Sequence, residues 1–533
     1  MTTYQLSTID LKTQKYDRQL RLWASTGQQA LENANICLLN ATTTGCEILK
    51  NLILPGVGSV TIVDNKKVDK KDVQYNFFLE NENISMSKAE AVMNLLKELN
   101  EEVKASFVDM APHLIIEQNP EFFNAFDLII ATNLLEDDVI RLADICQETQ
   151  KKLISVHCKG YCGVFRIQAN EHTMIETHPE NVIDIRLSDP FPQLSDFTNT
   201  FADLSTLDQT DHAHVPYIVI LLIFAEKWKA SHDGKLPQNY SERNELKAQI
   251  RATMRTVDEE NFEEAISNIW RLSPSSNHIP SNVQAIFNDP SCEHLNKEST
   301  YFWIIARAVR DFVKNEGNGQ LPLPGKLPDM KSDTRNYVAL QNVYRQKAKE
   351  DLDAVIERVN SLLEEYHIPS EHVPKEAIES FCKNAAHVKM IKYRSIKESN
   401  QQSSNEIENL ILSDENFGYY IVFKAADKFY KQHNRYPGKR NNEDEELTLL
   451  KQQVITTLQE LGIENTSSLV DTALIKPITN FLRFADIETP NLAALVGGLV
   501  AQEVIKLITH QYIPINNTCL FNGIASTSSI FEL

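Results

Sequence analysis

The segment from Ile36 to Asp64 constrains the fold most, because it alternates a strand pattern with a helix pattern. Residues 36–39 form a short apolar run, and residues 60–63 form a β-branched run that leads directly into Asp64. Between them, apolar residues within 46–54 recur at helical spacing until a Pro-Gly pair ends the pattern. Two such runs around an amphipathic helix indicate a βαβ unit with parallel strands. The segment therefore predicts a Rossmann-like α/β sheet near the N-terminus.

The turn after the first strand departs from the pattern that binds nucleotides. In dinucleotide-binding folds the turn reads G-x-G-x-x-G, whose first two glycines allow a tight turn and close approach of phosphate. Residues 40–45 read Asn-Ala-Thr-Thr-Thr-Gly, so only Gly45 matches. Thr42 is β-branched, disfavours positive φ and would fill space that a phosphate needs. Asp64 still stands where such folds hold a ribose hydroxyl, so the scaffold is predicted without a working phosphate loop.

Length, charge and cysteine usage limit the class of protein. The 533 residues suggest two to four domains, and the net charge of −20 argues against a nucleic-acid partner. We find no apolar run of membrane-spanning length and no signal-peptide pattern, so no membrane partner is expected. Eight scattered cysteines without CxxC or zinc spacing indicate free thiols in a reducing compartment. We therefore expect a cytoplasmic location, with the nucleus as an open alternative.

Five segments together carry a family resemblance. They are YDRQLRLW at 16–23, EILKNLILPGVGSVTIVD at 47–64, KAEAVMNLL at 88–96, AALVGGLVAQEVIK at 493–506 and YIPINNTCLFNG at 512–523. In combination they resemble the adenylation fold of the ubiquitin-like-protein activating enzymes, which bacterial sulfur-carrier adenylating enzymes share. Each motif is weak alone, and the combination is specific.

The resemblance implies a division of the chain into three parts. Residues 1–170 and 481–533 are predicted to form the two parts of the Rossmann-like adenylation fold. Residues 171–480, which show mainly helical periodicity, are predicted to form a large insertion equivalent to part of the catalytic-cysteine domain. The fold class is thus α/β, with a large, mainly helical insertion.

The resemblance also implies a role for Arg18. In this family two adenylation units pair, and the partner of the ATP-binding unit lends an arginine from its N-terminal Tyr-x-Arg-Gln segment. Arg18 occupies that position, and a guanidinium offers forked donors to phosphate oxygens. The simpler interpretation, a solvated helix with surface arginines, remains open from composition alone.

Several positions depart from the family pattern for ATP and Mg²⁺. Tyr75 stands at the family's ATP-contacting arginine, and Thr132 stands at the aspartate that helps hold Mg²⁺. A threonine hydroxyl is a poor substitute for an anionic ligand of a hard cation. Lys88 matches a later lysine, for which a surface role is as open as a phosphate role. We therefore expect this chain to bind no cofactor itself, with ATP and Mg²⁺ in the partner subunit.

No cysteine or histidine fits a catalytic or metal role well. Cys292 is the one cysteine that invites comparison with the family's thioester-forming residue, which threonine follows. Here Glu293 follows it, and the neighbouring Asp289 and Glu293 would raise its pKa and weaken the thiolate. His212 and His214 lack a third ligand, so no metal site is expected.

The segment from Lys331 to Tyr344, KSDTRNYVALQNVY, carries an apolar and aromatic helical face. Such a face is either a core face or a docking surface, since aromatic residues are enriched at interfaces. The resemblance favours contact with a catalytic partner. The predicted partner-facing residues are Lys331, Tyr337, Leu340, Gln341, Val343 and Tyr344.

These observations lead to one functional expectation and its alternatives. The chain resembles the regulatory-subunit type of heterodimeric activating enzyme that serves the neddylation modifier. The resemblance implies a catalytic activating-enzyme subunit and a ubiquitin-like modifier as partners, and no adenylation by this chain alone. The alternatives are a regulatory subunit of the SUMO-activating enzyme, a non-catalytic scaffold, and an autonomous enzyme, which the altered turn disfavours.

Overall fold

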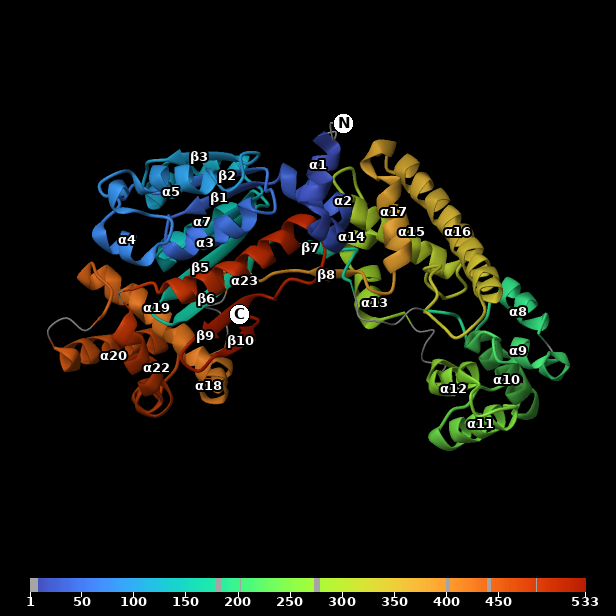
Figure 1. Cartoon of the computed structure of the whole chain (residues 1–533). Helices are drawn as coiled ribbons and strands as arrows, with labels where there is room; N and C mark the ends of the chain where they lie inside the picture. Colours follow the sequence, from blue (N-terminus) through green and yellow to red (C-terminus); the bar gives the residue numbers. More distant parts are fainter. Residues whose placement is uncertain are drawn as a thin grey trace, which may run out of the picture. The chain divides into compact units, whose positions relative to one another are not determined.

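A computed structural model describes residues 8–178, 184–201, 203–272, 279–398, 403–438, 442–485 and 487–533. The chain divides into two compact units. Unit 1 combines residues 1–172 with residues 391–533, and unit 2 consists of residues 173–390 (Figure 1).

Unit 1 is built on an eight-stranded sheet of order β10-β9-β6-β5-β4-β1-β2-β3. Its strands are β1 (Asn35–Leu39), β2 (Ser59–Val63), β3 (Lys104–Val108), β4 (Leu128–Thr132), β5 (Lys152–Lys159), β6 (Cys162–Gln168), β9 (Thr518–Asn522) and β10 (Thr527–Phe531). The first five strands pair in parallel, and β6, β9 and β10 continue the sheet in antiparallel pairing. The parallel order 3-2-1-4-5 is that of a Rossmann-like fold, so the predicted α/β class is confirmed.

Helices cover both faces of this sheet because neighbouring residues of a strand point to opposite sides. In β1, Ile36 and Leu38 pack into one cluster with α3, α5 and α23, whereas Cys37 and Leu39 pack into another with α6 and α7. The helices of unit 1 are α1 (Thr8–Lys15), α2 (Asp17–Asn33), α3 (Thr43–Ile53), α4 (Lys70–Tyr75), α5 (Lys88–Lys97), α6 (Pro112–Gln118), α7 (Glu136–Glu148), α18 (Ser404–Ser413), α19 (Glu415–His433), α20 (Glu443–Glu460), α21 (Thr466–Leu469), α22 (Ile475–Phe484) and α23 (Pro490–Thr509).

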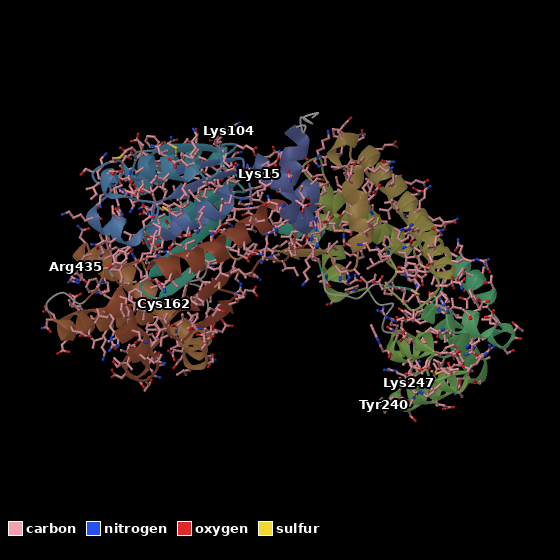
Figure 2. The ribbon with its side chains drawn as sticks, viewed as in Figure 1. Lys15, Lys104, Cys162, Tyr240, Lys247 and Arg435 are labelled. Carbon is pink, nitrogen blue, oxygen red and sulfur yellow. The ribbon has the colours of Figure 1, made fainter. Side chains whose placement is uncertain are left out.

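The helices between residues 404 and 484 belong to unit 1, which corrects the predicted boundary at residue 480. Their apolar side chains form one core with the antiparallel strands, which contribute Cys162, Val164 and Leu520. Cys162, labelled in Figure 2, lies on β6 within this core. Unit 2 therefore ends at Met390, and the first predicted boundary, at residue 170, is close to the observed one.

Unit 2 is helical apart from a short two-stranded sheet of β7 (His172–Met174) and β8 (Lys389–Ile391), along which the chain enters and leaves it. Its helices are α8 (Pro192–Asn199), α9 (Gln209–His212), α10 (Tyr217–Ser231), α11 (Tyr240–Ala252), α12 (Glu260–Ser267), α13 (Ser281–Phe287), α14 (Pro290–Glu293), α15 (Tyr301–Lys314), α16 (Thr334–Glu365) and α17 (Lys375–Asn384). Two apolar cores stabilise it, one around α10 and one around α15.

Helix α23 has the length and apolar composition of a membrane-spanning helix, with a mean hydropathy of 1.7. This corrects the prediction that the chain has no apolar run of membrane-spanning length. Half of that window is buried. Gly497 lies against α3, where a Cβ would come within 2.7 Å of the Glu47 Cβ. The helix is therefore a core helix of unit 1, and such core helices can have the same length and apolar composition as a membrane-spanning helix.

Candidate functional site

The carboxyl ends of β1, β2 and β4 meet at one edge of the sheet, where Rossmann-like folds bind their ligands. Asn40 follows β1 in a left-handed conformation, with φ of 66°, and its side-chain amide donates to the Thr132 carbonyl at 2.9 Å. The Thr132 hydroxyl in turn lies 2.7 Å from the Asn40 carbonyl. The threonine at the family's metal-ligand position is thus bonded to the backbone of β1 and is fully buried.

The first turn of α3 is bound by a carboxylate of the same chain. Glu488 accepts hydrogen bonds from the backbone N–H groups of Thr43 and Thr44, at 3.1 and 3.0 Å, and a short one from the Thr44 hydroxyl. Backbone N–H groups at this position of the fold bind the phosphates of a nucleotide. The carboxylate of Glu488 therefore takes the donors that a phosphate would use.

The segment that carries Glu488 is held against the end of β5. The Gly160 N–H donates to the Ile487 carbonyl at 2.8 Å, and the Thr489 hydroxyl donates to the Gly160 carbonyl at 2.7 Å. Gly160 has a φ of 58°, and a Cβ there would lie 2.4 Å from the Phe484 Cβ. Glu488 was missed from the sequence because no local pattern connects it with residues about 445 positions earlier.

The remaining residues of the turn are also satisfied internally. The Thr42 hydroxyl accepts from the Gly45 N–H at 3.1 Å, so Thr42 is the N-cap of α3. Gly45 packs against Leu38, which matches the packing role of the third glycine in the fingerprint. Asp64 is buried, and its carboxylate accepts from the backbone N–H groups of Ala41 and Lys66, both at 2.9 Å.

Lys88 is paired inside the fold as well. Its ammonium lies 2.5 Å from the Asp72 carboxylate, and the side chain is 11% exposed. Burial acts to lower the pKa of Lys88, but the carboxylate of Asp72 offsets this and the net shift is upward. Tyr75 ends α4 and is half-buried. The structural interpretation of Lys88 is therefore favoured over a phosphate role, and the residues of this edge do not fit a nucleoside triphosphate with Mg²⁺.

Arg18 differs from all of these residues because its side chain is exposed. It lies in the first turn of α2, and among the described residues its side chain has no hydrogen bond or ion pair. Arg21, one turn later, pairs with Asp17 at 3.0 Å. Of the two arginines in the predicted motif, Arg18 is thus the one with its guanidinium available to another molecule.

The cysteines are all buried free thiols. Cys292 is fully buried in α14, and burial, as the largest cause, raises its pKa to about 11 although Arg310 and Arg307 lower it. It is therefore poorly suited to act as a nucleophile. His212 pairs with Glu259 at 2.8 Å in the core of unit 2. Within the described ranges, no cluster of three or more His, Cys, Asp or Glu residues could hold a metal.

The predicted partner-facing segment divides into core and surface residues. Leu340 and Tyr344 are fully buried, and the Tyr344 hydroxyl donates to the Ile185 carbonyl at 2.5 Å. Val343 packs against the same core. Leu340 and Tyr344 therefore belong to the interior of unit 2, which corrects the prediction that they face a partner. Val343 is half-buried, so its partner-facing role stays a prediction.

The other predicted residues of this segment remain on the surface of unit 2. Lys331 is exposed and pairs with Glu260 at 2.8 Å, and Tyr337 is half-buried. Gln341 lines a groove of the same unit. Among the six predicted residues, a docking role is therefore left to those outside the core.

Helix α23 presents a second open face. Its small residues Ala493, Gly497 and Ala501 are buried in unit 1, so on this side they serve internal packing. On the opposite side, Leu495 and Leu499 are 44% and 38% exposed. From the sequence, the small residues of this helix could serve internal packing or an interface. In the structure the small residues pack inside unit 1, and the side with the exposed leucines is the one available for an interface.

A cavity of about 80 Å³ lies between the sheet and α19 in unit 1. Its lining includes His157, Arg166, Lys424 and Asp427. Burial, as the largest cause, raises the pKa of Asp427 to about 7, and lowers that of His157 to about 4. Both groups are therefore driven towards their neutral forms by the apolar surroundings.

Comparison with known proteins agrees with this geometry. Residues 16–532 match the ThiF family. The chain is 40% identical to the NEDD8-activating enzyme E1 regulatory subunit of Gallus gallus, over 98% of each chain. It is 41% identical to the NEDD8-activating enzyme E1 regulatory subunit AXR1 of Arabidopsis thaliana, covering 98% of this chain and 97% of that protein.

Among solved structures, Escherichia coli tRNA N6-threonylcarbamoyladenosine dehydratase in complex with AMP is 18% identical. It aligns with a TM-score of 0.27 over 30% of this chain and 68% of its own. The full-length similarity to the curated relatives decides the assignment. The chain belongs to the ThiF family and, within it, to the family of NEDD8-activating enzyme E1 regulatory subunits.

Proposed function

We propose that this chain is the non-catalytic adenylation unit of a heterodimer that activates NEDD8. A catalytic partner subunit binds ATP, Mg²⁺ and the C-terminus of the modifier, and that partner carries the cysteine that receives the modifier. The relatives are regulatory subunits of NEDD8-activating enzymes, which supports both the catalytic partner and NEDD8 as the modifier.

The observation that carries the proposal is the carboxylate of Glu488 on the first turn of α3. A triphosphate would have to displace this carboxylate, and it would then meet Asp64 and Asp72, whose charges are already bonded within the fold. Because carboxylates and phosphates repel each other, the carboxylate of Glu488 on the first turn of α3 disfavours ATP at this edge. Thr132 provides no anionic ligand for Mg²⁺.

Arg18 is the residue through which this chain would act on its partner's ATP. Adenylation transfers AMP to the carboxylate of the modifier and releases pyrophosphate, so negative charge grows on the leaving group. A guanidinium placed beside those oxygens lowers the barrier by stabilising that charge. Arg18 is exposed and its guanidinium has no partner among the described residues, so it can be presented without breaking an internal ion pair.

The open faces described above are the candidates for the dimer interface. The row of Leu495 and Leu499 on α23 offers apolar surface, and Lys331, Tyr337 and Gln341 offer a second, polar contact area on unit 2. Burial of exposed apolar side chains is the main favourable contribution to stable association.

ATP–pyrophosphate exchange tests the proposal. We expect no exchange above background with this chain alone and robust exchange when the catalytic subunit and NEDD8 are added. Robust exchange by the isolated chain would contradict the non-catalytic assignment. If the catalytic subunit were equally active without this chain, the scaffold alternative would be favoured instead.

A further inference from the structure

Unit 2 contains a groove of about 510 Å³ whose charge is opposite to that of the whole chain. It is lined by residues 323–327, by one face of α16 and by the end of α17. Its ionisable side chains are Lys326, Arg345, Lys349, Lys383, Glu379 and Cys382. Four cationic groups against one carboxylate stand out in a chain with a net charge of −20. We call this feature the basic groove.

The basic groove is held open by specific packing of residues 323–327 on α16. Gly325 has a φ of 68°, and a Cβ there would lie 2.7 Å from the Ala348 Cβ, so the backbone approaches the helix closely. The Leu323 N–H donates to the Asp351 carboxylate at 3.0 Å, and Lys347 pairs with the same carboxylate at 2.7 Å. The groove is therefore a built feature of the unit.

Three of its cations have no partner among the residues that the structure describes. Lys326, Arg345 and Lys349 are exposed, and none of them has a side-chain hydrogen bond or ion pair among the described residues. Asp351 of the same helix is buried and already bonded to Leu323 and Lys347. It therefore does not neutralise Arg345 and Lys349.

Several cations of unit 2 outside the groove are paired with carboxylates. Arg358 pairs with Glu316 at 2.8 Å, Arg307 with Asp311 at 2.9 Å, and Lys331 with Glu260 at 2.8 Å. Unpaired cations gathered in one groove of an acidic protein indicate a surface that is completed by an external anion.

We propose that the basic groove binds an acidic peptide segment of a partner protein. Carboxylates of the segment pair with Arg345, Lys349 and Lys326, and an apolar side chain packs on Leu352 and Leu327 in the wall of the groove. This apolar wall favours a peptide over a free phosphate. The net charge of −20 disfavours a nucleic acid, whose long run of phosphates would meet an acidic surface beyond the groove.

The test uses the full chain and a fluorescein-labelled peptide that alternates Glu-Asp pairs with Leu. A second peptide, in which Gln and Asn replace the acids, measures the contribution of charge. We expect anisotropy to report binding of the acidic peptide alone. Binding should weaken by roughly tenfold or more in the double variant Arg345→Glu, Lys349→Glu, and should fall steeply with added salt.

A matched control separates the groove from the general charge of the surface. The double variant Lys314→Glu, Lys375→Glu makes the same charge change at two exposed lysines of unit 2 outside the groove, which have no ion pair within the described ranges. It should bind the acidic peptide as the wild type does. Equal weakening by both double variants, or equal binding of both peptides, would overturn the proposal.

Two further readouts complete the test. If inorganic triphosphate binds at the groove and the acidic peptide does not, the ligand of the groove is a small anion. That result would overturn the proposal. The milder variant Lys326→Ala, whose side chain is exposed, guards against misfolding of the double variant. It should weaken peptide binding by a few-fold at unchanged Tm, and no weakening in any groove variant would contradict the assignment.

Discussion

The ligand edge of the sheet in unit 1 and the basic groove of unit 2 differ in how far the chain satisfies its own charges. At the ligand edge, Glu488 binds the first turn of α3, Asp64 binds backbone N–H groups, and Lys88 pairs with Asp72. In the basic groove, Arg345 and Lys349 have no such partner among the described residues. The edge of the sheet where this family binds its ligand is thus occupied by the chain's own side chains. The exposed cations on α16, in contrast, remain available to a ligand.

The comparison teaches that the bonding of polar groups is a better guide to function than their position in the fold. A polar group that already has its hydrogen bonds gains little from a ligand, because binding only exchanges one partner for another. An exposed unpaired cation gives up only bound water. Four predictions follow the same distinction in unit 1, in order of decreasing effect.

The largest effect on activity is expected for Arg18, whose side chain is exposed. Replacement Arg18→Ala in the reconstituted heterodimer should lower the rate of NEDD8 adenylation on the order of 100-fold, because one stabilising contact to the developing charge is lost. Pyrophosphate exchange measures this rate. Arg21→Ala is the matched control, since Arg21 is paired with Asp17, and it should retain nearly full activity. Equal losses in the two variants would contradict the assignment of Arg18.

Asp427 sharpens the comparison because it is a buried acid whose hydrogen bonds are to the Tyr436 hydroxyl, at 3.4 Å, and to the backbone of Glu136. Burial and the neighbouring Glu136 raise its pKa from 3.8 to about 7, while Lys159 lowers it. Between pH 4 and 7 the folded state holds a proton that the unfolded state has lost, so rising pH destabilises the fold.

Asp427→Asn cannot ionise and should escape this loss. The free energy of unfolding of the variant, relative to that of the wild type, should therefore rise by on the order of 2 kcal/mol between pH 5 and pH 8. Urea unfolding at both pH values gives the difference. A constant difference across this range would show that Asp427 does not titrate there.

Glu488→Ala tests the closed edge directly. The substitution leaves two backbone N–H groups of α3 without their charged acceptor, so the free energy of unfolding should fall by about 1–2 kcal/mol. Added phosphate should raise the Tm of this variant more than that of the wild type, because the vacated first turn attracts an anion. Glu464→Ala, at an exposed position of unit 1, should do neither. Unchanged stability in Glu488→Ala would break the comparison.

The smallest effects distinguish the two sides of α23. Gly497→Ala should destabilise unit 1 by about 1 kcal/mol, because the new Cβ would lie 2.7 Å from the Glu47 Cβ. Gly498→Ala meets no atom within 4 Å and should be neutral or stabilise by up to about 1 kcal/mol through helix propensity. Thermal unfolding of the isolated chain measures both. Similar losses at the two positions would contradict the assignment of an open face.

Local patterns in the sequence predicted the first βαβ unit of the sheet. The apolar runs at 36–39 and 60–63 became β1 and β2. The strand β3 was not recognised, since Lys104–Val108 is an edge strand with mostly exposed or half-buried residues and no clear alternation. Periodicity detects a strand only where one or both of its faces are buried.

Long-range relations were the part that sequence could not supply. Helical periodicity over 404–484 is the same whichever unit the helices pack against, so the boundary at residue 480 rested on the resemblance alone. The apolar face with Leu340 and Tyr344 fitted a core or an interface equally well, and only the buried hydrogen bond of Tyr344 decides it. Glu488 is a single acidic residue whose role depends on contacts with distant parts of the chain.

The contact between Glu488 and the first turn of α3 has a consequence for synthesis on the ribosome. The N-terminal strands emerge early, but the carboxylate that completes their edge and the strand β9 that pairs with β6 are translated hundreds of codons later. During that interval α3 lacks the carboxylate on its first turn, and β6, which pairs with β5, has one open edge. Unit 1 can therefore complete its sheet only after translation is nearly complete, and until then the exposed strand edge makes its early half prone to aggregate.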